Sequence, residues 1–536
     1  MEKRKNTRWN GWGYESVYID IPFKAKELLT DTVGPGKIQK DYPLKEYLNK
    51  VPPSRFGSHP LIITTPRERL FHAHGQSLPD WIGFRGGTLD CFPDGVAFPE
   101  NIEQIKELIH YANNNQVVII PYGGGTSVVG HLKVPNDKRP VLSICLKRFN
   151  RMIAFDPYTR IATFEAGIKG PEIERHLNPK GFTLGHFPQS FEFSSLGGWV
   201  VTRSSGQQAL KYGSINELFV GGQVLTPKGK IDILPLPASA AGPDIKHLVM
   251  GSEARMGILT HVTVKVSPIP HKDDVYGVFF PSWENALEAV RVIMGEDIPL
   301  SMLRLSNPRE TQINLSLAGH NRLSWILNKY LKIRGFPDSG NCMALIGFAG
   351  SSRMVLQAFK EVSCHIRKFK GVRVGRSMGK AWKKNRFQVP YLRNTLWDLG
   401  YAIDSLETAV NWDKVTSTMK NIEKVLHQGL TPLGEKIYAF SHLSHVYPTG
   451  SNIYTTFLFR LADTPEQTLL RWKILKKNAS RAIINARGTI SHQHGIGVDH
   501  LPYISAEKGN LGMELIRTLC SHVDPEKRMN PGKLIG

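Results

Sequence analysis

The stretch Pro121-Tyr122-Gly123-Gly124-Gly125-Thr126-Ser127 separates two short apolar runs, residues 117–121 and 141–144, which the sequence predicts to be buried strands. Glycine tolerates positive φ angles, so three in succession let neighbouring N–H groups converge on one anion, with two hydroxyls as further donors. Neither the dinucleotide GxGxxG pattern nor a Walker GK[ST] sequence is present. A pyrophosphate-binding loop is therefore one interpretation, and a plain glycine-rich turn is the other.

The segments around this loop alternate between helix and strand. Apolar residues recur at helical spacing from Ile102 to Ala112, just before the strand that leads into the loop. Further on, Val262, Val264 and Val266 alternate with polar residues, as in a half-buried strand. The prolines that follow, at 268 and 270, end this strand and predict a domain boundary.

Two clusters of small and hydroxylated residues follow the loop, at 188–206 and 251–258. Such sequence suits a backbone that wraps closely around a flat cofactor and offers Ser and Thr hydroxyls to its polar edges. With the loop, the clusters give these candidate cofactor-binding residues: Pro121, Tyr122, Gly123, Gly124, Gly125, Thr126, Ser127, Gln189, Ser190, Ser194, Ser195, Thr202, Arg203, Ser204, Ser205, Glu253, Ala254, Arg255, Gly257 and Ile258.

Composition is that of a globular enzyme with two or three structural units, since the chain has 536 residues, 41% of them hydrophobic. We find no apolar window long enough to span a bilayer, no signal peptide at the polar start and no clear peroxisomal signal at the end, and therefore expect a cytoplasmic protein. The five cysteines form no CxxC pair, so neither a metal site nor a disulfide framework is expected. A net charge of +22 favours anionic partners, such as phosphorylated metabolites or acidic lipid surfaces, unless it is only a well-solvated surface.

The three clusters, in this order, resemble the FAD-binding domain of the vanillyl-alcohol oxidase and p-cresol methylhydroxylase superfamily. The resemblance implies an α+β fold with a two-subdomain FAD-binding domain and an inserted α+β cap domain. It predicts an N-terminal segment at 1–88, the FAD-binding domain at 89–270, the cap at 271–450 and a C-terminal segment at 451–536. No motif for covalent attachment of the flavin is found, so the expected cofactor is non-covalent FAD.

Within the superfamily, the sequence is most similar to the alkyldihydroxyacetonephosphate synthases, which make the ether bond of ether lipids. The matching stretches run over nearly the whole chain: Arg8-Trp-Asn-Gly-Trp-Gly13, Arg69-Leu-Phe-His-Ala-His-Gly75, Met302-Leu-Arg-Leu305, Pro390-Tyr-Leu-Arg-Asn394 and Asp404-Ser-Leu-Glu-Thr408. The resemblance implies that Arg393 binds the substrate phosphate, with Arg304 as a second cation and Ser405 nearby. Guanidinium suits a phosphate because it is a planar, permanently charged fork of donors.

The same resemblance implies that Tyr454 is the acid/base tyrosine and that His494, His492 and His186 are active-site histidines. A tyrosine accepts protons readily only if neighbouring cations favour the phenolate, and Arg or His could do so. The chain departs from the family at Gln493, which replaces the middle histidine of a triplet, at Gln189, which replaces an aspartate, and at Ala254-Arg255, which replace a Gly-Thr pair.

The resemblance implies exchange of the acyl group of acyl-dihydroxyacetone phosphate for a long-chain alcohol, without net oxidation. We also expect a homodimer and peripheral contact with an anionic membrane, from which both greasy substrates must be taken. The leading alternative is an FAD-dependent dehydrogenase or oxidase of a D-lactate-type 2-hydroxyacid, because His494-Gly-Ile-Gly497 and Asn530-Pro-Gly-Lys533 suit that class equally. A flavin-binding protein without activity is a third interpretation. Nucleic acid is not expected as a partner, since no nucleic-acid-binding signature accompanies the charge.

Overall fold

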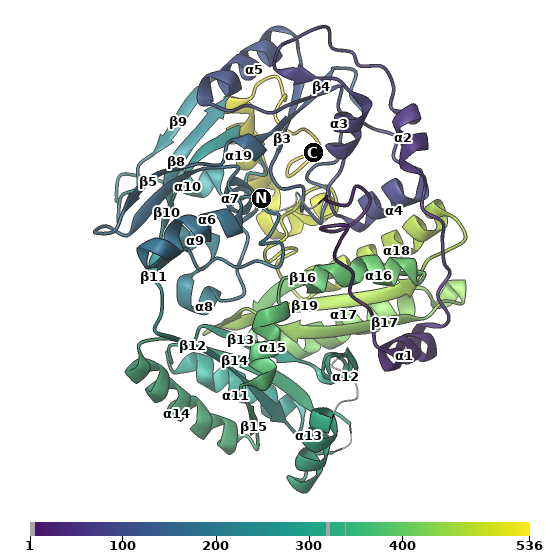
Figure 1. Ribbon diagram of the computed structural model, residues 1–536, viewed down its shortest axis with the longest axis vertical. Coiled ribbons are helices and arrows are strands. Elements are labelled where there is room, and N and C mark those ends of the chain that lie inside the picture. The colour runs from purple at the N-terminus through teal and green to yellow at the C-terminus, as the bar shows by residue number, and fades with distance from the viewer. Residues whose placement is uncertain (1–5, 318–321, 338) are drawn as a thin grey trace.

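The computed structural model describes residues 6–317, 322–337 and 339–536 (Figure 1). In the upper half of the view, the first subdomain carries a sheet in the order β1-β2-β4-β3, in which β2, β4 and β3 are parallel. Its elements are α2 (Leu44–Lys50), β1 (Ile62–Ile63), α3 (Pro66–Phe71), α4 (Leu78–Gly86), β2 (Gly95–Ala97), α5 (Ile102–Asn114), β3 (Val118–Tyr122) and β4 (Val141–Cys145). The expected helix and both expected strands around the glycine loop are confirmed.

The second subdomain is built on an antiparallel sheet in the order β5-β6-β10-β8-β9. It shares one hydrophobic core with the first subdomain, in which Ile105 of α5 and Val262 of β10 are both fully buried. Its elements are β5 (Met152–Asp156), β6 (Ile161–Glu165), α6 (Gly170–Leu177), β7 (Phe182–Thr183), α7 (Leu196–Thr202), α8 (Ala209–Tyr212), α9 (Ile215–Leu218), β8 (Phe219–Thr226), β9 (Gly229–Ile233), α10 (Lys246–Val249), β10 (Ile258–Lys265) and β11 (Ser267–Pro268).

The lower half of the molecule is the cap, an antiparallel sheet in the order β15-β12-β14-β13-β17-β19-β16, with β18 paired to β19 (Figure 1). Its elements are β12 (Lys272–Phe280), α11 (Trp283–Gly295), β13 (Met302–Ser306), α12 (Pro308–Leu317), α13 (Arg322–Ile333), β14 (Cys342–Gly350), α14 (Ser352–Lys368), β15 (Val372–Gly375), α15 (Ser377–Asn385), α16 (Leu392–Asp398), β16 (Tyr401–Asn411), α17 (Val415–Gly429), β17 (Ile437–Leu443), β18 (Val446–Tyr447) and β19 (Gly450–Arg460).

The sequence placed the end of the cap at residue 450, whereas the sheet continues to Arg460 and α18 (Pro465–Asn485) packs on it. Alternation along β19 explains this arrangement, because Phe457 and Phe459 are buried on the face that α17 and α18 cover. Tyr454 therefore lies on the opposite face. There it pairs with Glu407 of β16 on one side and with His442 of β17 on the other.

Both ends of the chain return to other parts of the molecule. At the N-terminus, an arm of residues 6–20 lies against the cap, where Trp12 and Asn394 exchange two hydrogen bonds of 3.0 Å between main chain and amide side chain. Gly13, at φ +78°, packs so tightly on the ring of Tyr391 that a Cβ would lie 2.2 Å from it. At the C-terminus, α19 (Ser505–Val523) leads to a segment that bridges Met529 to Ile119 of β3.

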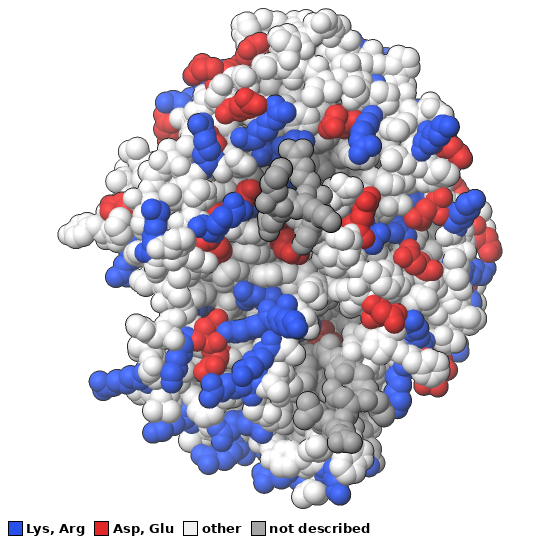
Figure 2. Space-filling model, in the orientation of Figure 1, with Lys and Arg blue, Asp and Glu red and all other residues white. Residues whose placement is uncertain are grey.

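Charge is unevenly distributed over the face that Figure 2 shows. In the lower half of the view, which is the cap, Lys and Arg side chains outnumber Asp and Glu side chains (Figure 2). Within the described ranges, no helix combines the length and the apolar character that crossing a bilayer requires.

Candidate active site

The glycine loop forms a cradle with unused donors. It begins where β3 ends, and within the described part of the chain the backbone N–H groups of residues 124–128 donate to no protein acceptor. A Cβ on Gly124 would lie 1.9 Å from the carbonyl oxygen of Phe193, and Gly125 has φ +71°. Only glycine fits at these two positions, so the main chain stays accessible to a ligand that needs several N–H donors.

The second cluster lies directly against this loop. A Cβ on Gly123 would lie 2.3 Å from Oγ of Ser195, whose hydroxyl caps α7. Ser194 accepts a 2.7 Å hydrogen bond from the indole of Trp199 and also contacts Ser190. The structure therefore brings the loop and the cluster together, and close backbone approach with free N–H groups is what the diphosphate of FAD requires.

Several other candidate cofactor residues have partners elsewhere. Arg203, at φ +55°, donates to the carbonyl oxygens of Met250 and His247, and Arg255 donates to that of Met529. Other candidates take up local positions along the chain. Pro121 and Tyr122 end β3, Thr126 and Ser127 complete the loop, Gln189 precedes Ser190 in a turn, and Ile258 begins β10. Thr202 donates to Gly198, Ser204 contacts His186, Ser205 is buried, Ala254 has φ +61° and Gly257 has φ +135°.

Tyr454 is the centre of the cap side of the site. Its hydroxyl is 2.8 Å from Oγ of Ser405, its ring stacks on His442 at 4.9 Å, and His494 meets it edge-on at 5.6 Å. Burial raises the pKa of Tyr454 above its usual value, and the opposing effects of Ser405 and Arg304 are smaller. The phenol is therefore neutral, because burial outweighs Arg304, the neighbouring cation that favours the phenolate.

Arg304 is part of a buried network rather than a free cation. Its Nη2 donates to Oε1 of Glu310 at 2.7 Å and lies 3.2 Å from Nδ1 of His442. Nδ1 of His442 is also 2.8 Å from the same carboxylate. Burial alone would raise the pKa of Glu310, but Arg304 and His442 outweigh it and hold this pKa well below its usual range. The network fixes the ring that stacks on Tyr454.

Arg393 differs from Arg304 because most of its donors are unused. Its Nη1 donates to the carbonyl of Gln76, and its guanidinium lies 4.3 Å from the ring centroid of Trp81. Nε and Nη2 are enclosed and find no partner in the part of the chain that the structure describes. Burial lowers the pKa of Arg393 to about 10, which leaves it charged at neutral pH. An enclosed cation with free donors is suited to a phosphate or carboxylate.

The three candidate histidines lie in one connected group. His492 is 2.6 Å from the hydroxyl of Tyr447, and its ring is 4.9 Å from that of His445. Burial lowers the pKa of His186, and nearby His445 adds to this effect. Burial lowers the pKa of His494 to about 3, so this ring is neutral at physiological pH. His186 lies on the FAD-binding side, 3.2 Å from Ser204.

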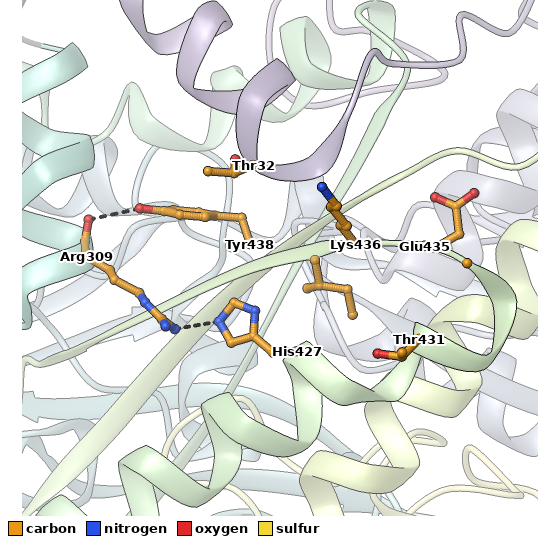
Figure 3. A pocket seen from close by; sticks show the side chains of 9 residues that line it. Thr32, Arg309, His427, Thr431, Glu435, Lys436 and Tyr438 are labelled. Carbon is orange, nitrogen blue, oxygen red and sulfur yellow. Dashed lines mark hydrogen bonds between the residues drawn. The ribbon is translucent and has the colours of Figure 1, made fainter.

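A surface pocket of about 580 Å³ lies between α1 (Phe23–Val33), α17 and β17 (Figure 3). Arg309 contacts His427 there, the hydroxyl of Tyr438 donates to the carbonyl of Arg309, and Glu435 is bound by Arg460 and Arg471. Arg309 and Glu435 thus already have partners, unlike the free donors of Arg393. The lining residues are Thr32, Arg309, His427, Thr431, Gly434, Glu435, Lys436, Ile437 and Tyr438.

Sequence reasoning did not find Glu310, His442 or Glu407. Glu310 follows Arg304 by six residues, but His442 reaches it only through the pairing of β13 with β17. The one usable signal was the alternation of Tyr438, Phe440 and His442 along a single strand face.

Comparison with known proteins agrees with this geometry. Residues 93–234 match the family model "FAD binding domain", and residues 269–534 match "FAD linked oxidases, C-terminal domain". A solved p-cresol methylhydroxylase shares the fold, with a TM-score of 0.63 at 15% identity over 95% of this chain and 96% of that chain. The fold and the cradle thus define an FAD-dependent enzyme, and the expected two-subdomain domain with its cap is confirmed.

More similar proteins identify the family. An alkyldihydroxyacetonephosphate synthase of Dictyostelium discoideum is 32% identical over 87% of this chain and 77% of its own length. The synthase of Trypanosoma brucei brucei is 29% identical over 100% of this chain and 94% of its own. A solved alkyldihydroxyacetonephosphate synthase has a TM-score of 0.83 at 26% identity and covers 98% of both chains. The chain belongs to the alkyldihydroxyacetonephosphate synthase family, as the sequence motifs had indicated.

Proposed function

We propose that this chain exchanges the acyl group of an acyl-dihydroxyacetone phosphate for a long-chain alcohol and so forms the ether bond of an ether lipid. Membership of the synthase family supports this activity. The observation that carries it within the site is Arg393, an enclosed cation with unused donors that lies within electrostatic range of Tyr454. A phosphate is the anion that such a guanidinium binds best, because it can accept several charge-assisted hydrogen bonds at once.

In this proposal the residues around Tyr454 divide the work. Arg393 binds the substrate phosphate, while Arg304 holds His442 and Glu310 in place and adds positive potential. The incoming alcohol must lose its proton when the carboxylate leaves. The Tyr454 hydroxyl, bonded to Ser405, would take up that proton while it passes its own to the departing carboxylate, and His494 would assist by holding the edge of the phenol ring. His492 and His186 are further members of the histidine group, and both lie near His445.

The cofactor-binding residues are proposed on the same basis. The free N–H groups of residues 124–128 would hold the diphosphate of FAD, and Ser190, Ser194 and Ser195 would lie beside it. FAD, when bound, would supply an electron-accepting ring next to the substrate site. We found no attachment motif for a covalent link in the sequence, and we propose non-covalent binding.

The decisive experiment gives the purified yellow protein palmitoyl-dihydroxyacetone phosphate and isotope-labelled hexadecanol, with product detection by mass spectrometry. The expected result is the labelled ether with release of palmitate and no change in the flavin absorption band at the end of the reaction. If D-lactate or another 2-hydroxyacid instead bleaches the flavin band without air, the dehydrogenase alternative is correct. A protein that keeps FAD but turns over neither substrate would be a flavoprotein without this activity.

We also propose that helix α13 contacts an anionic membrane. Trp325, Ile326 and Ile333 are exposed, and Lys329 and Arg334 are exposed among them. The inner side of the same helix is anchored, since Leu331 is buried in a small cluster with Phe336. Apolar side chains flanked by lysine and arginine are typical of helices that lie in the headgroup region.

The membrane proposal predicts that the protein sediments with vesicles that contain phosphatidylserine and not with pure phosphatidylcholine vesicles. Replacement of Trp325 and Ile333 by Ser should remove this binding while leaving flavin content unchanged. Equal binding by this double variant would rule out α13 as the contact. The homodimer is likewise a proposal, which mass photometry at nanomolar concentration can test.

A further inference from the structure

The loop that carries His494 is held by two buried carboxylates, one from each domain. Oε1 of Glu407, on strand β16 of the cap, accepts the backbone N–H groups of Gln493 at 2.5 Å and His494 at 2.7 Å. Glu253, from the FAD-binding domain, accepts those of Ile496 at 2.5 Å and Gly497 at 2.9 Å. Two N–H groups before Gly495 are thus held by the cap, and two after it by the FAD-binding domain.

Glu407 is a buried carboxylate that uses only one of its two oxygens as a hydrogen-bond acceptor. It is fully buried, and its second oxygen, Oε2, has no hydrogen-bond partner among the residues that the structure describes. Burial raises the pKa of Glu407 to about 7, against the opposing effect of the two backbone N–H groups. A buried carboxylate with one unsatisfied oxygen costs folding free energy, so its place in the sheet calls for a functional reason.

The position of Glu407 in the sheet supplies that reason. Glu407 pairs with Tyr454 across the β16–β19 ladder, and Ser405, two residues earlier on the same face, is 2.8 Å from the Tyr454 hydroxyl. One strand therefore sets both the hydroxyl that contacts the phenol and the loop that presents His494 to it. The two rings meet at an interplanar angle of 83°.

We propose that Glu407 is the positioning residue that sets His494 against Tyr454, with Glu253 as the anchor on the FAD-binding side. The proposal deepens the proposed function, because it rests on Tyr454 and His494 taking part in the reaction. Glu407 acts here through the acceptor oxygen that holds two N–H groups, and its distance from the ring atom Nδ1 of His494 is 3.7 Å. The other charged or titratable groups that face Glu407 are His492 from the same loop, Lys476 from α18, Tyr447 from β18 and Tyr454 from β19.

Two variants of similar volume distinguish the effect of the acceptor oxygen of Glu407 from the effect of side-chain size. Glu407→Gln keeps an oxygen for the two N–H groups, whereas Glu407→Met fills the space without one. We expect kcat for the ether product to stay within about threefold of wild type in Glu407→Gln and to fall by about 10- to 100-fold in Glu407→Met, with KM little changed, because a small misplacement of a reacting group has effects of this size. Glu165→Gln is the matched control, since Glu165 is a buried carboxylate that accepts the N–H of Arg151 at 2.7 Å in β6.

Hydrogen exchange tests the positioning whether or not the ether product forms. In Glu407→Met, the amides of Gln493 and His494 should exchange faster while those of β19 stay protected, and in Glu407→Gln both should behave as in wild type. Wild-type kcat in Glu407→Met overturns the proposal, and so does an equal loss of kcat in Glu407→Gln, because charge and not position would then be at work. Loss of FAD together with activity in Glu407→Met also overturns it, since the role would be structural. If the wild type makes no ether, only the proposed function fails, and the exchange pattern still decides the role of Glu407.

Discussion

Replacement of Tyr454 by Phe is the sharpest test of the site. The change removes one oxygen atom and leaves the ring between His442 and His494, so the stacking contacts at 4.9 and 5.6 Å remain. It breaks one hydrogen bond, the 2.8 Å contact with Ser405. A single neutral hydrogen bond is worth about 0.5–1.5 kcal/mol, so the melting temperature should change by only a few degrees.

The effect on the reaction should be much larger. Proton transfer by a positioned side chain contributes about 10²- to 10⁴-fold to a rate, which is about 3–6 kcal/mol at about 1.4 kcal/mol for each tenfold. We therefore expect kcat of Tyr454→Phe to fall by that factor. Ser405→Ala is the matched control, because it breaks the same hydrogen bond and keeps the phenol, and its kcat should fall by only about fivefold.

The assay is ether formation from acyl-dihydroxyacetone phosphate under saturating substrate, with the flavin content of each variant measured from its visible absorption. Both variants should retain FAD, since Tyr454 and Ser405 belong to the cap sheet. A Tyr454→Phe protein with kcat within threefold of wild type would refute the proton relay. An equal fall in the two variants would show that the hydrogen bond matters and the phenolic proton does not.

Three further results are expected. Gly124→Ala should lose FAD, because its Cβ would meet the Phe193 carbonyl at 1.9 Å, while Gly295→Ala, with no atom within 4 Å, should keep it; equal absorption at 450 nm would contradict the cradle. Arg393→Lys should raise KM by about tenfold or more in initial-rate assays, since lysine keeps the charge but lacks the planar fork; an unchanged KM would place the phosphate elsewhere. Folded Glu407 holds a proton up to a pKa of about 7, whereas a glutamate in the unfolded chain has a pKa of 4.5. Its contribution to stability therefore falls as pH rises between these values, by up to about 3 kcal/mol. The thermal stability of Glu407→Gln should thus gain on that of the wild type from pH 5 to pH 8, and a constant difference would contradict the raised pKa.

Individual helices and strands near the glycine loop could be predicted from the sequence. The helical spacing between Ile102 and Ala112 predicted α5, and the apolar runs on either side of the glycine loop predicted β3 and β4. These patterns work because a helix or strand that buries one face must repeat its apolar residues at its own period. The motifs also placed Tyr454, Ser405 and His494 in one site, where they lie within direct ring or hydrogen-bond contact.

Contacts between residues far apart in the sequence could not be predicted. Glu310 and His442 are 132 positions apart in the sequence and meet only because β13 and β17 pair in the cap sheet. Glu407 reaches the histidine loop across 86 positions. The sequence put the end of the cap at residue 450, which lies in the tight turn between β18 and β19, where Tyr447 pairs with Gly450. Register between distant strands leaves no periodic signal in the sequence.

The N-terminal arm has a consequence for motion. Trp12 is hydrogen-bonded to Asn394 of the cap, next to Arg393, and Arg85 of α4 donates a hydrogen bond to the carbonyl of Asn10. The arm is thus tethered to both halves of the enzyme. A hinge motion that separates the two halves would have to break these hydrogen bonds of the arm. We therefore expect substrates to enter through small side-chain or loop movements. A shortened protein that begins after residue 20 should show wider motion between the two halves and bind the proposed phosphate ligand less tightly.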